Sequence, residues 1–229
     1  MDEMIDTPSP NFDARTLPIS MVVLHYTGMI DGASAINRLA DPEAKVSAHY
    51  VVAEDGQIIR MVDEANRAWH AGKSWWRGIS DVNSASVGIE IVNPGHEFGY
   101  RPFPQVQIES VIRLVAGVVS RYGITRGNVV GHSDVAPARK DDPGELFPWH
   151  QLAKLRLALP RPTKNLMDPH WSDAGFLLAL ERFGYDVTDG PAAVRAFQRR
   201  FRPELMDGII DGECRAILLA LLLPKPMGD

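Results

Sequence analysis

Short strand-like segments alternate with helix-like segments over roughly the first 150 residues of the chain. Residues 19–26 and 86–92 are rich in Val and Ile, which is typical of buried central strands. Residues 48–52 and 57–62 flank the turn signal Glu54-Asp55-Gly56 and predict a β-hairpin, and residues 128–131 predict a short strand. This alternation predicts an α/β sandwich rather than an all-α or all-β fold.

Apolar residues at helical spacing predict the helices of this region. The clearest helix covers residues 104–122, begins at a proline and is followed by Gly123. A weaker helical pattern covers residues 33–39. The predicted helices would cover the faces of the sheet.

The character of the chain changes at residues 159–164, where two prolines stiffen an extended connection. Beyond this point, residues 173–183, 191–201 and 213–223 predict three short helices, with Asp211 as the N-cap of the last. We therefore expect a catalytic domain at residues 1–158, a linker at 159–170 and a small three-helix domain at 171–229.

Composition excludes several function classes. The chain has 24 Lys and Arg against 29 Asp and Glu, a net charge of -5 without a basic block, so nucleic acid is not an expected partner. The longest apolar stretch, residues 216–223, is too short to span a bilayer. Cys214 is the single cysteine, so an internal disulfide framework is excluded.

The start of the chain bears on location. Residues 1–6 are acidic, whereas a signal peptide needs a basic start and an apolar centre. We therefore expect a cytoplasmic protein. The alternative is a periplasmic protein whose export signal has been removed.

Two histidines and an aspartate follow predicted strands or lie in the loop beyond one. His25 ends the first buried strand, His132 follows the strand at 128–131, and Asp142 lies in the next loop. Two imidazoles and a carboxylate are a ligand set of catalytic zinc, because three protein ligands leave the fourth position open. Taken singly, each residue is better explained as a hydrogen-bonded core histidine or a helix cap. Together they indicate metal-assisted hydrolysis.

Glu90 and Lys140 supply groups that such a reaction needs. Glu90 stands in the apolar strand at 86–92, where a buried, unpaired carboxylate is costly. Beside a metal-bound water it would act as general base; the alternative is a structural salt bridge. Lys140 would place an ammonium beside the oxyanion of an attacked carbonyl. Without Asp142 nearby, a solvated surface lysine would be the better explanation.

A stretch with little periodicity carries tryptophans at positions 69, 75 and 76. Indole faces in loops are suited to stacking on sugars or contacting peptide, although an aromatic lid explains Trp75 and Trp76 equally well. His70 would bind substrate or support the site. The expected substrate-binding residues are Tyr26, Arg67, Trp69 and His70. Three other histidines carry no functional signal: His96, His150 and His170.

Six motifs follow one another in the first part of the chain: Val23-Leu24-His25-Tyr26-Thr27, Ser47-Ala48-His49-Tyr50-Val51-Val52, Arg67-Ala68-Trp69-His70-Ala71-Gly72, Ser86-Val87-Gly88-Ile89-Glu90, Gly131-His132-Ser133-Asp134-Val135-Ala136-Pro137 and Arg139-Lys140-Asp141-Asp142-Pro143-Gly144. In this order they resemble the zinc N-acetylmuramoyl-L-alanine amidases of the AmpD type, the amidase 2 family. The resemblance implies a mixed central β-sheet flanked by helices, as in phage T7-type lysozyme and peptidoglycan recognition proteins. It also implies one Zn²⁺ per chain, held by His25, His132 and Asp142. In that family pattern Glu90 is the general base and Lys140 stabilises the tetrahedral intermediate.

The C-terminal part carries a second resemblance. Ala193-Val194-Arg195-Ala196-Phe197-Gln198 and Asp207-Gly208-Ile209-Ile210-Asp211-Gly212 are similar to segments of the three-helix peptidoglycan-binding domain. That domain family often has a threonine at the opening of the last helix, where this chain has Cys214. Retention of its fold is therefore a firmer expectation than retention of glycan binding.

The family resemblance implies a reaction and a partner. The bond cut would join the lactyl group of N-acetylmuramic acid to L-alanine in peptidoglycan fragments, and we expect 1,6-anhydro-muropeptides of cell-wall recycling as substrates. The alternatives are an exported wall-remodelling amidase that acts on sacculi, a phage-type endolysin, and a non-catalytic muropeptide recognition module. The sequence implies muropeptides as partners and no obligate protein partner.

Overall fold

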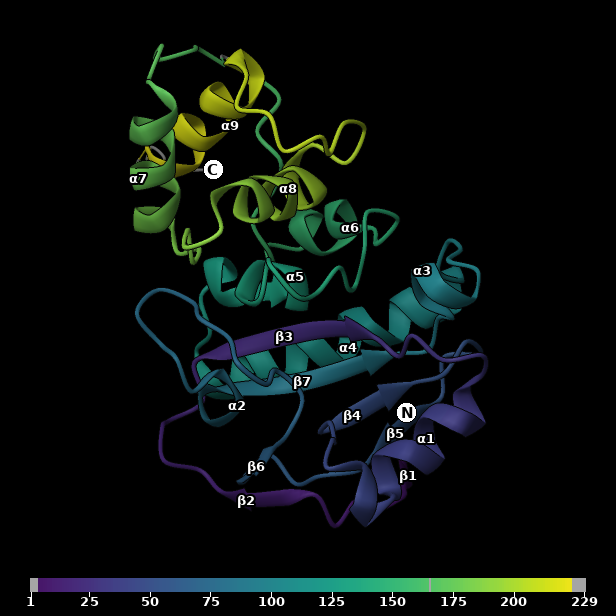
Figure 1. Cartoon of the computed structure of the whole chain (residues 1–229). Helices are drawn as coiled ribbons and strands as arrows, with labels where there is room; N and C mark the ends of the chain where they lie inside the picture. The colour runs from purple at the N-terminus through teal and green to yellow at the C-terminus, as the bar shows by residue number, and fades with distance from the viewer. Residues whose placement is uncertain (1–3, 165, 224–229) are drawn as a thin grey trace.

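The computed structural model describes residues 4–164 and 166–223 of the chain (Figure 1). The strands are β1 (Ile5–Asp6), β2 (Phe12–Ala14), β3 (Met21–Tyr26), β4 (Tyr50–Val52), β5 (Ile58–Arg60), β6 (Asn66–Ala68), β7 (Ser86–Ile91) and β8 (Val129–Gly131). The α-helices are α1 (Gly32–Ala40), α2 (Val82–Ala85), α3 (Gly95–Phe98), α4 (Gln105–Tyr122), α5 (His132–Val135), α6 (Trp149–Lys154), α7 (Asp173–Phe183), α8 (Gly190–Phe201) and α9 (Gly212–Leu222). Two short 3₁₀ helices, η1 (Pro42–Ala44) and η2 (Arg126–Asn128), complete the described elements.

A six-stranded mixed sheet forms the centre, in the order β1-β5-β4-β7-β3-β8. Neighbouring strands run parallel except β4 and β5, which form the predicted antiparallel hairpin. β2 and β6 form a separate antiparallel pair. Parallel strands are covered on both faces, which explains why β3 and β7 are almost continuously apolar. The predicted fold class, a mixed sheet flanked by helices, is confirmed.

Alternate residues of β3 and β7 face opposite layers of the fold. Val22 and Leu24 pack in the apolar cluster under α4, whereas Met21 and Val23 belong to the cluster on the other face. His25 continues the face of Met21 and Val23, because side chains alternate along a strand. The parallel register pairs His25 with Glu90 of β7. An imidazole and a carboxylate therefore lie side by side on the face opposite α4.

α4 is the predicted long helix at 104–122. Its apolar stripe, which includes Ile108, Val111, Val115 and Val118, is buried against the sheet. Gly123 ends the helix with a φ of 62°, in the left-handed region where glycine is favoured. Within the described residues, the structure contains no helix with both the length and the apolar character needed to cross a membrane.

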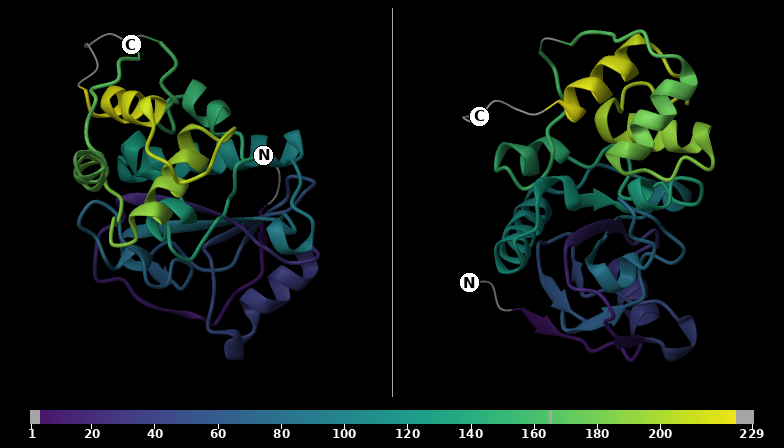
Figure 2. Two further views of the ribbon diagram at one scale, coloured as in Figure 1. Left: turned by 45° about the horizontal axis from the view of Figure 1, so that its top comes forward. Right: turned by 90° about the vertical axis from the view of Figure 1, so that its left-hand side faces the viewer.

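The three C-terminal helices α7, α8 and α9 follow the predicted spans closely, and the Asp211 side chain accepts a hydrogen bond from the backbone N–H of Cys214 as the predicted N-cap. Figure 2 shows these helices stacked at the end of the fold where α5 and α6 lie. They share one apolar cluster with the sheet, since residues such as Phe197 and Ile217 pack in the same cluster as Met21 and Val130.

Trp76 lies within this shared cluster. Its side chain is 2% exposed and packs edge-on against Phe183 and Tyr185. Of the two explanations for this tryptophan, a packing role without ligand contact fits the structure. Trp75 remains half-buried at the surface.

Candidate functional site

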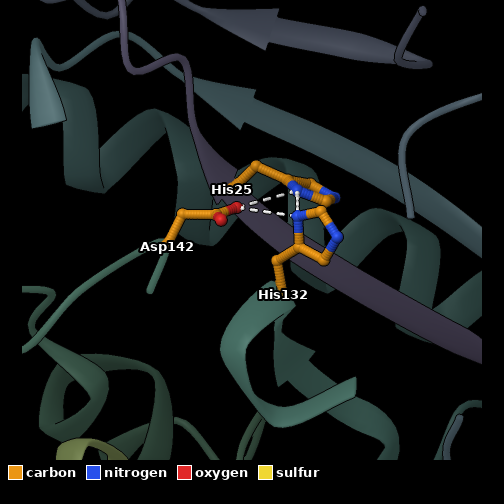
Figure 3. A group of neighbouring side chains, drawn as sticks. All are labelled: His25, His132 and Asp142. Carbon is orange, nitrogen blue, oxygen red and sulfur yellow. Dashed lines mark hydrogen bonds and ion pairs between the residues drawn. The ribbon is translucent and has the colours of Figure 1, made fainter. Parts of the chain in front are cut away.

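Three buried side chains bring one acceptor atom each to a common point (Figure 3). Nδ1 of His25 lies 2.9 Å from Nδ1 of His132 and 3.0 Å from Oδ2 of Asp142, and the His132 and Asp142 atoms are 3.1 Å apart. A tetrahedral zinc ion with ligands at 2.0–2.1 Å spaces them ~3.3 Å apart. The predicted ligand set is therefore assembled with the spacing of a small cation site.

The hydrogen bonds made by Nε2 of His25 and of His132 decide whether each Nδ1, which faces this point, carries a proton. Nε2 of His132 lies 3.1 Å from the carbonyl oxygen of Ala71, which can only accept, so Nε2 carries the proton. Nδ1 of His132 is then left with a lone pair directed at the cluster. A neutral imidazole in this tautomer is a metal ligand.

A relay of three groups sets the tautomer of His25. The hydroxyl of Ser86 donates to the carbonyl oxygen of Val82 at 2.5 Å, so its oxygen accepts from Nε2 of His70 at 3.2 Å. His70 therefore presents an unprotonated Nδ1, which lies 3.0 Å from Nε2 of His25 and accepts a hydrogen bond from the N–H of that nitrogen. Nδ1 of His25 is left as an acceptor. Three acceptors without a proton between them repel one another, and a bound cation would remove that repulsion.

His70 reaches this position because β7 has no side chain at residue 88. A Cβ at Gly88 would lie 2.4 Å from Cγ of His70, well inside van der Waals contact. The backbone N–H groups of His70 and Ala71 donate to the side-chain oxygen of Asn83, which fixes the loop. His70 is thus a support for His25, one of the two roles expected for it.

Burial and charge set the protonation states of the cluster. Burial and the facing His132 lower the pKa of His25 to about 4, and burial lowers the pKa of His70 well below its ordinary value. Burial raises the pKa of Asp142, but the positive charge that His132 and His25 carry when protonated outweighs this effect and holds the pKa below its usual range. Neutral imidazoles and an ionised carboxylate are the forms that bind a dication.

Glu90 and Lys140 line the same cavity, of about 390 Å³, as the three candidate ligands. Oε2 of Glu90 is buried and has no hydrogen-bond partner among the described residues. Burial and the Asp142 carboxylate raise the pKa of Glu90 well above its usual value, while the Lys140 ammonium opposes them. The structural salt bridge weighed for Glu90 is therefore not its explanation. An orphaned carboxylate beside a cation site is suited to proton transfer.

Tyr26 and Trp69 also line the cavity, as does His70, so three of the four expected substrate-binding residues lie there. Burial raises the pKa of Tyr26 to about 12. Nε1 of Trp69 is buried without a hydrogen-bond partner within the described part of the chain. Both side chains are therefore placed where a bound molecule would meet them.

The structure does not bring Arg67 to the cavity. Its Nε lies 3.0 Å from Oδ1 of Asp81 and its Nη1 lies 3.2 Å from Oδ2 of Asp13. These ion pairs tie β6 to β2 and to the start of α2. Arg67 is absent from the residues that line the cavity, because its guanidinium is held by Asp13 and Asp81, so a substrate contact from Arg67 stays a prediction.

His96, for which no role was expected, lines the cavity. Its ring stacks on Tyr100, its Nδ1 lies 3.0 Å from the hydroxyl of Tyr26, and its Nε2 lies 3.1 Å from Glu145. A positional signal does exist, because His96 follows the carboxyl end of a central parallel strand, where ligands commonly bind in α/β sheets.

Comparisons with known proteins assign the family. A family profile described as N-acetylmuramoyl-L-alanine amidase matches residues 15–145. The chain is 38% identical to the N-acetylmuramoyl-L-alanine amidase AmiD of Escherichia coli, over 89% of this chain and 82% of AmiD. This chain belongs to the N-acetylmuramoyl-L-alanine amidase family. The predicted enzyme class is confirmed, and the protein is an amide hydrolase of this family.

Other amidases of this group are also similar. The chain is 32% identical to the 1,6-anhydro-N-acetylmuramyl-L-alanine amidase AmpD of Haemophilus influenzae, over 62% of this chain and 86% of AmpD. The structure of Escherichia coli AmiD in complex with the substrate anhydro-N-acetylmuramic acid-L-Ala-D-gamma-Glu-L-Lys aligns with a TM-score of 0.80 at 36% identity, covering 92% of this chain and 91% of AmiD. The structure of AmpDH3 of Pseudomonas aeruginosa with anhydromuramic pentapeptide aligns with a TM-score of 0.79 at 31% identity, covering 93% of each chain.

Proposed function

We propose that this amidase uses one zinc ion, held by His25, His132 and Asp142, to hydrolyse the amide bond between N-acetylmuramic acid and L-alanine in 1,6-anhydro-muropeptides. The observation that carries the proposal is the orphaned Glu90 carboxylate beside three convergent acceptor atoms in one cavity. The substrate class is supported by AmiD and AmpDH3, whose solved structures hold anhydro-muramyl peptides. A role in cell-wall recycling follows from this substrate.

The chemistry is divided among the residues that line the cavity. When bound, zinc lowers the pKa of a coordinated water and polarises a carbonyl oxygen. Glu90 accepts the proton of the attacking water and then delivers it to the leaving amine nitrogen of L-alanine as the carbon–nitrogen bond breaks. The Lys140 ammonium stabilises the negative charge on the former carbonyl oxygen. Tyr26 and Trp69 are the proposed substrate contacts.

The test compares two substrates side by side. Purified protein with stoichiometric zinc is incubated with soluble anhydro-muropeptides and with intact sacculi, and the products are identified by mass spectrometry. We expect free stem peptide and the anhydro-muramyl sugar from the soluble substrate. Intact muropeptides would contradict hydrolysis. Faster release from sacculi would instead favour the wall-remodelling alternative and would bear on the cytoplasmic location, which stays a prediction.

Glu90→Gln separates catalysis from metal binding. Because Glu90 is not among the convergent atoms, the variant should bind zinc as the wild type does and lose turnover by a factor of ~10²–10⁴. Metal analysis and kcat measured on the same preparation check both statements. His25→Ala is the matched variant and should lose zinc and activity together. If Glu90→Gln lost zinc as well, Glu90 would be part of the metal site rather than the base.

A further inference from the structure

The C-terminal helices reach the loop that carries Asp142. Nη2 of Arg199, in the last turn of α8, lies 2.7 Å from Oδ1 of Asp141, and its Nε lies 3.8 Å from Oε2 of Glu145. The Arg199 side chain is only 13% exposed. One guanidinium therefore contacts carboxylates on both sides of Asp142 in the sequence.

The same part of the fold reaches the turn that carries His132. The hydroxyl of Tyr185, in the connection between α7 and α8, donates to Oδ1 of Asp134 at 2.5 Å. Oδ2 of Asp134 accepts from the backbone N–H of Gly131 at 2.8 Å, so this carboxylate closes the turn in which His132 stands. Both Tyr185 and Asp134 are buried. The hydroxyl thus fixes the group that shapes the start of α5.

A third contact anchors the strand before this turn. Arg200 is buried on α8, donates from Nη2 to the carbonyl oxygen of Val129 at 3.3 Å, and places its guanidinium over the ring of Trp149. Val129 begins β8, which leads directly to His132. The C-terminal helices are therefore tied to β8, to the turn of His132 and to the loop of Asp142.

These contacts matter because the acceptor atoms of His25, His132 and Asp142 must lie close together before a cation binds. Nδ1 of His25 is held on a central strand and by His70. His132 stands at the start of the four-residue helix α5 and Asp142 stands on a loop, so the repulsion of converging lone pairs would move these two groups apart unless other contacts hold them. A site is pre-organised only when its supporting residues are themselves held. Arg199 and Tyr185 provide that support from outside the sheet.

We propose that the C-terminal helices are a positioning part of the metal site, in which Arg199 and Tyr185 hold the ligands Asp142 and His132 in place to meet His25. The inference rests on the proposed function, because zinc is the proposed cation. It gives residues 173–222 a part in hydrolysis even of small soluble substrates, apart from any contact with glycan. Arg199 and Tyr185 act through the ligands and are positioning residues.

The experiment uses full-length variants. Arg199→Ala and Tyr185→Phe are compared with Arg199→Lys and with Arg195→Ala, which removes an exposed cation from the same helix. Zinc Kd is measured by chelator competition, the visible spectrum is recorded after Co²⁺ substitution, kcat and KM are measured on a soluble anhydro-muropeptide, and Tm is measured for the metal-free proteins.

We expect Arg199→Ala to raise the zinc Kd by about 10-fold or more, to alter the Co²⁺ spectrum and to lower kcat more than it raises KM. Arg199→Lys should restore part of the loss because its ammonium can still pair with Asp141. Tyr185→Phe should shift the Kd in the same direction, and Arg195→Ala should match the wild type. The inference is overturned if Arg199→Ala and Tyr185→Phe both lower Tm but have the same zinc Kd and the same kcat as the control variant Arg195→Ala. Wild-type protein that binds no zinc would instead overturn the proposed function itself.

Discussion

His70 decides which nitrogen the candidate ligand His25 presents to the proposed metal, although His70 is not itself one of the three candidate ligands. Its Nδ1 accepts from Nε2 of His25, and its own orientation is fixed by Ser86 and by the missing side chain at Gly88. Partners of this kind hold a metal-binding imidazole in one tautomer and one orientation. His96 differs, because its contacts to Tyr26 and Glu145 place it in the cavity wall.

His70→Ala should raise the zinc Kd ~10–100-fold, because His25 loses the acceptor that keeps its proton on Nε2. Chelator competition measures the Kd. His170→Ala is the control, since that side chain is 86% exposed. A zinc Kd in His70→Ala equal to that of the control would show that the hydrogen bond does not position His25.

Glu64 joins separate elements on the far side of the sheet. Its carboxylate accepts hydrogen bonds from Tyr50 of β4 and from Arg121 and Tyr122 at the end of α4. Burial raises the pKa of Glu64, but the hydrogen bonds from Arg121, Tyr122 and Tyr50 outweigh burial and leave the pKa below its ordinary value. A group with a lowered pKa stabilises the fold above its unfolded pKa, and this stabilisation is lost as the pH falls through the folded pKa.

Glu64→Gln should therefore lower the free energy of unfolding by ~1–3 kcal/mol at pH 7, and the difference from wild type should shrink as the pH falls below ~4. Urea unfolding at a series of pH values measures it. Glu43→Gln, an exposed carboxylate in η1, serves as the control. A difference between Glu64→Gln and wild type that stays constant down to pH 3.5 would contradict the ionised role of Glu64.

The whole molecule is joined by an apolar cluster that includes residues of the sheet, the loop around Trp76 and all three C-terminal helices. Such a cluster couples the parts, because opening the helices would expose side chains of the sheet to water. The division at residues 159–170 expected from the prolines stays a prediction, and its energetic consequence can be measured directly.

We expect a single cooperative unfolding transition. Leu180→Ala, in the centre of the shared cluster, should destabilise the protein by ~2–5 kcal/mol and move that one transition to lower temperature. Leu178→Ala is the matched control on α7, because Leu178 is 69% exposed. Calorimetry that resolves two transitions, with only the first shifted by Leu180→Ala, would show that the C-terminal helices unfold independently.

Local sequence patterns predicted the longest strands and helices of the fold, and the residue types of the candidate metal ligands. Strand and helix spans follow from periodicity and capping, which depend on near neighbours, as in α4 with Gly123 at its end and α9 with Asp211 at its start. The residue types at positions 25, 132 and 142 indicated a metal, and the ordered motifs indicated the family. These conclusions needed no knowledge of distant contacts.

Contacts between residues that are distant in the sequence follow from the tertiary fold alone. The strand register sets His25 beside Glu90, and contacts across 45 and 117 positions bring His70 and Asp142 to His25. The same folding turns Arg67 toward Asp81 rather than the cavity, and it places Arg199 against the loop of Asp142. Such pairings depend on side-chain packing over the whole chain, and the periodicity of neighbouring residues carries no information about that packing.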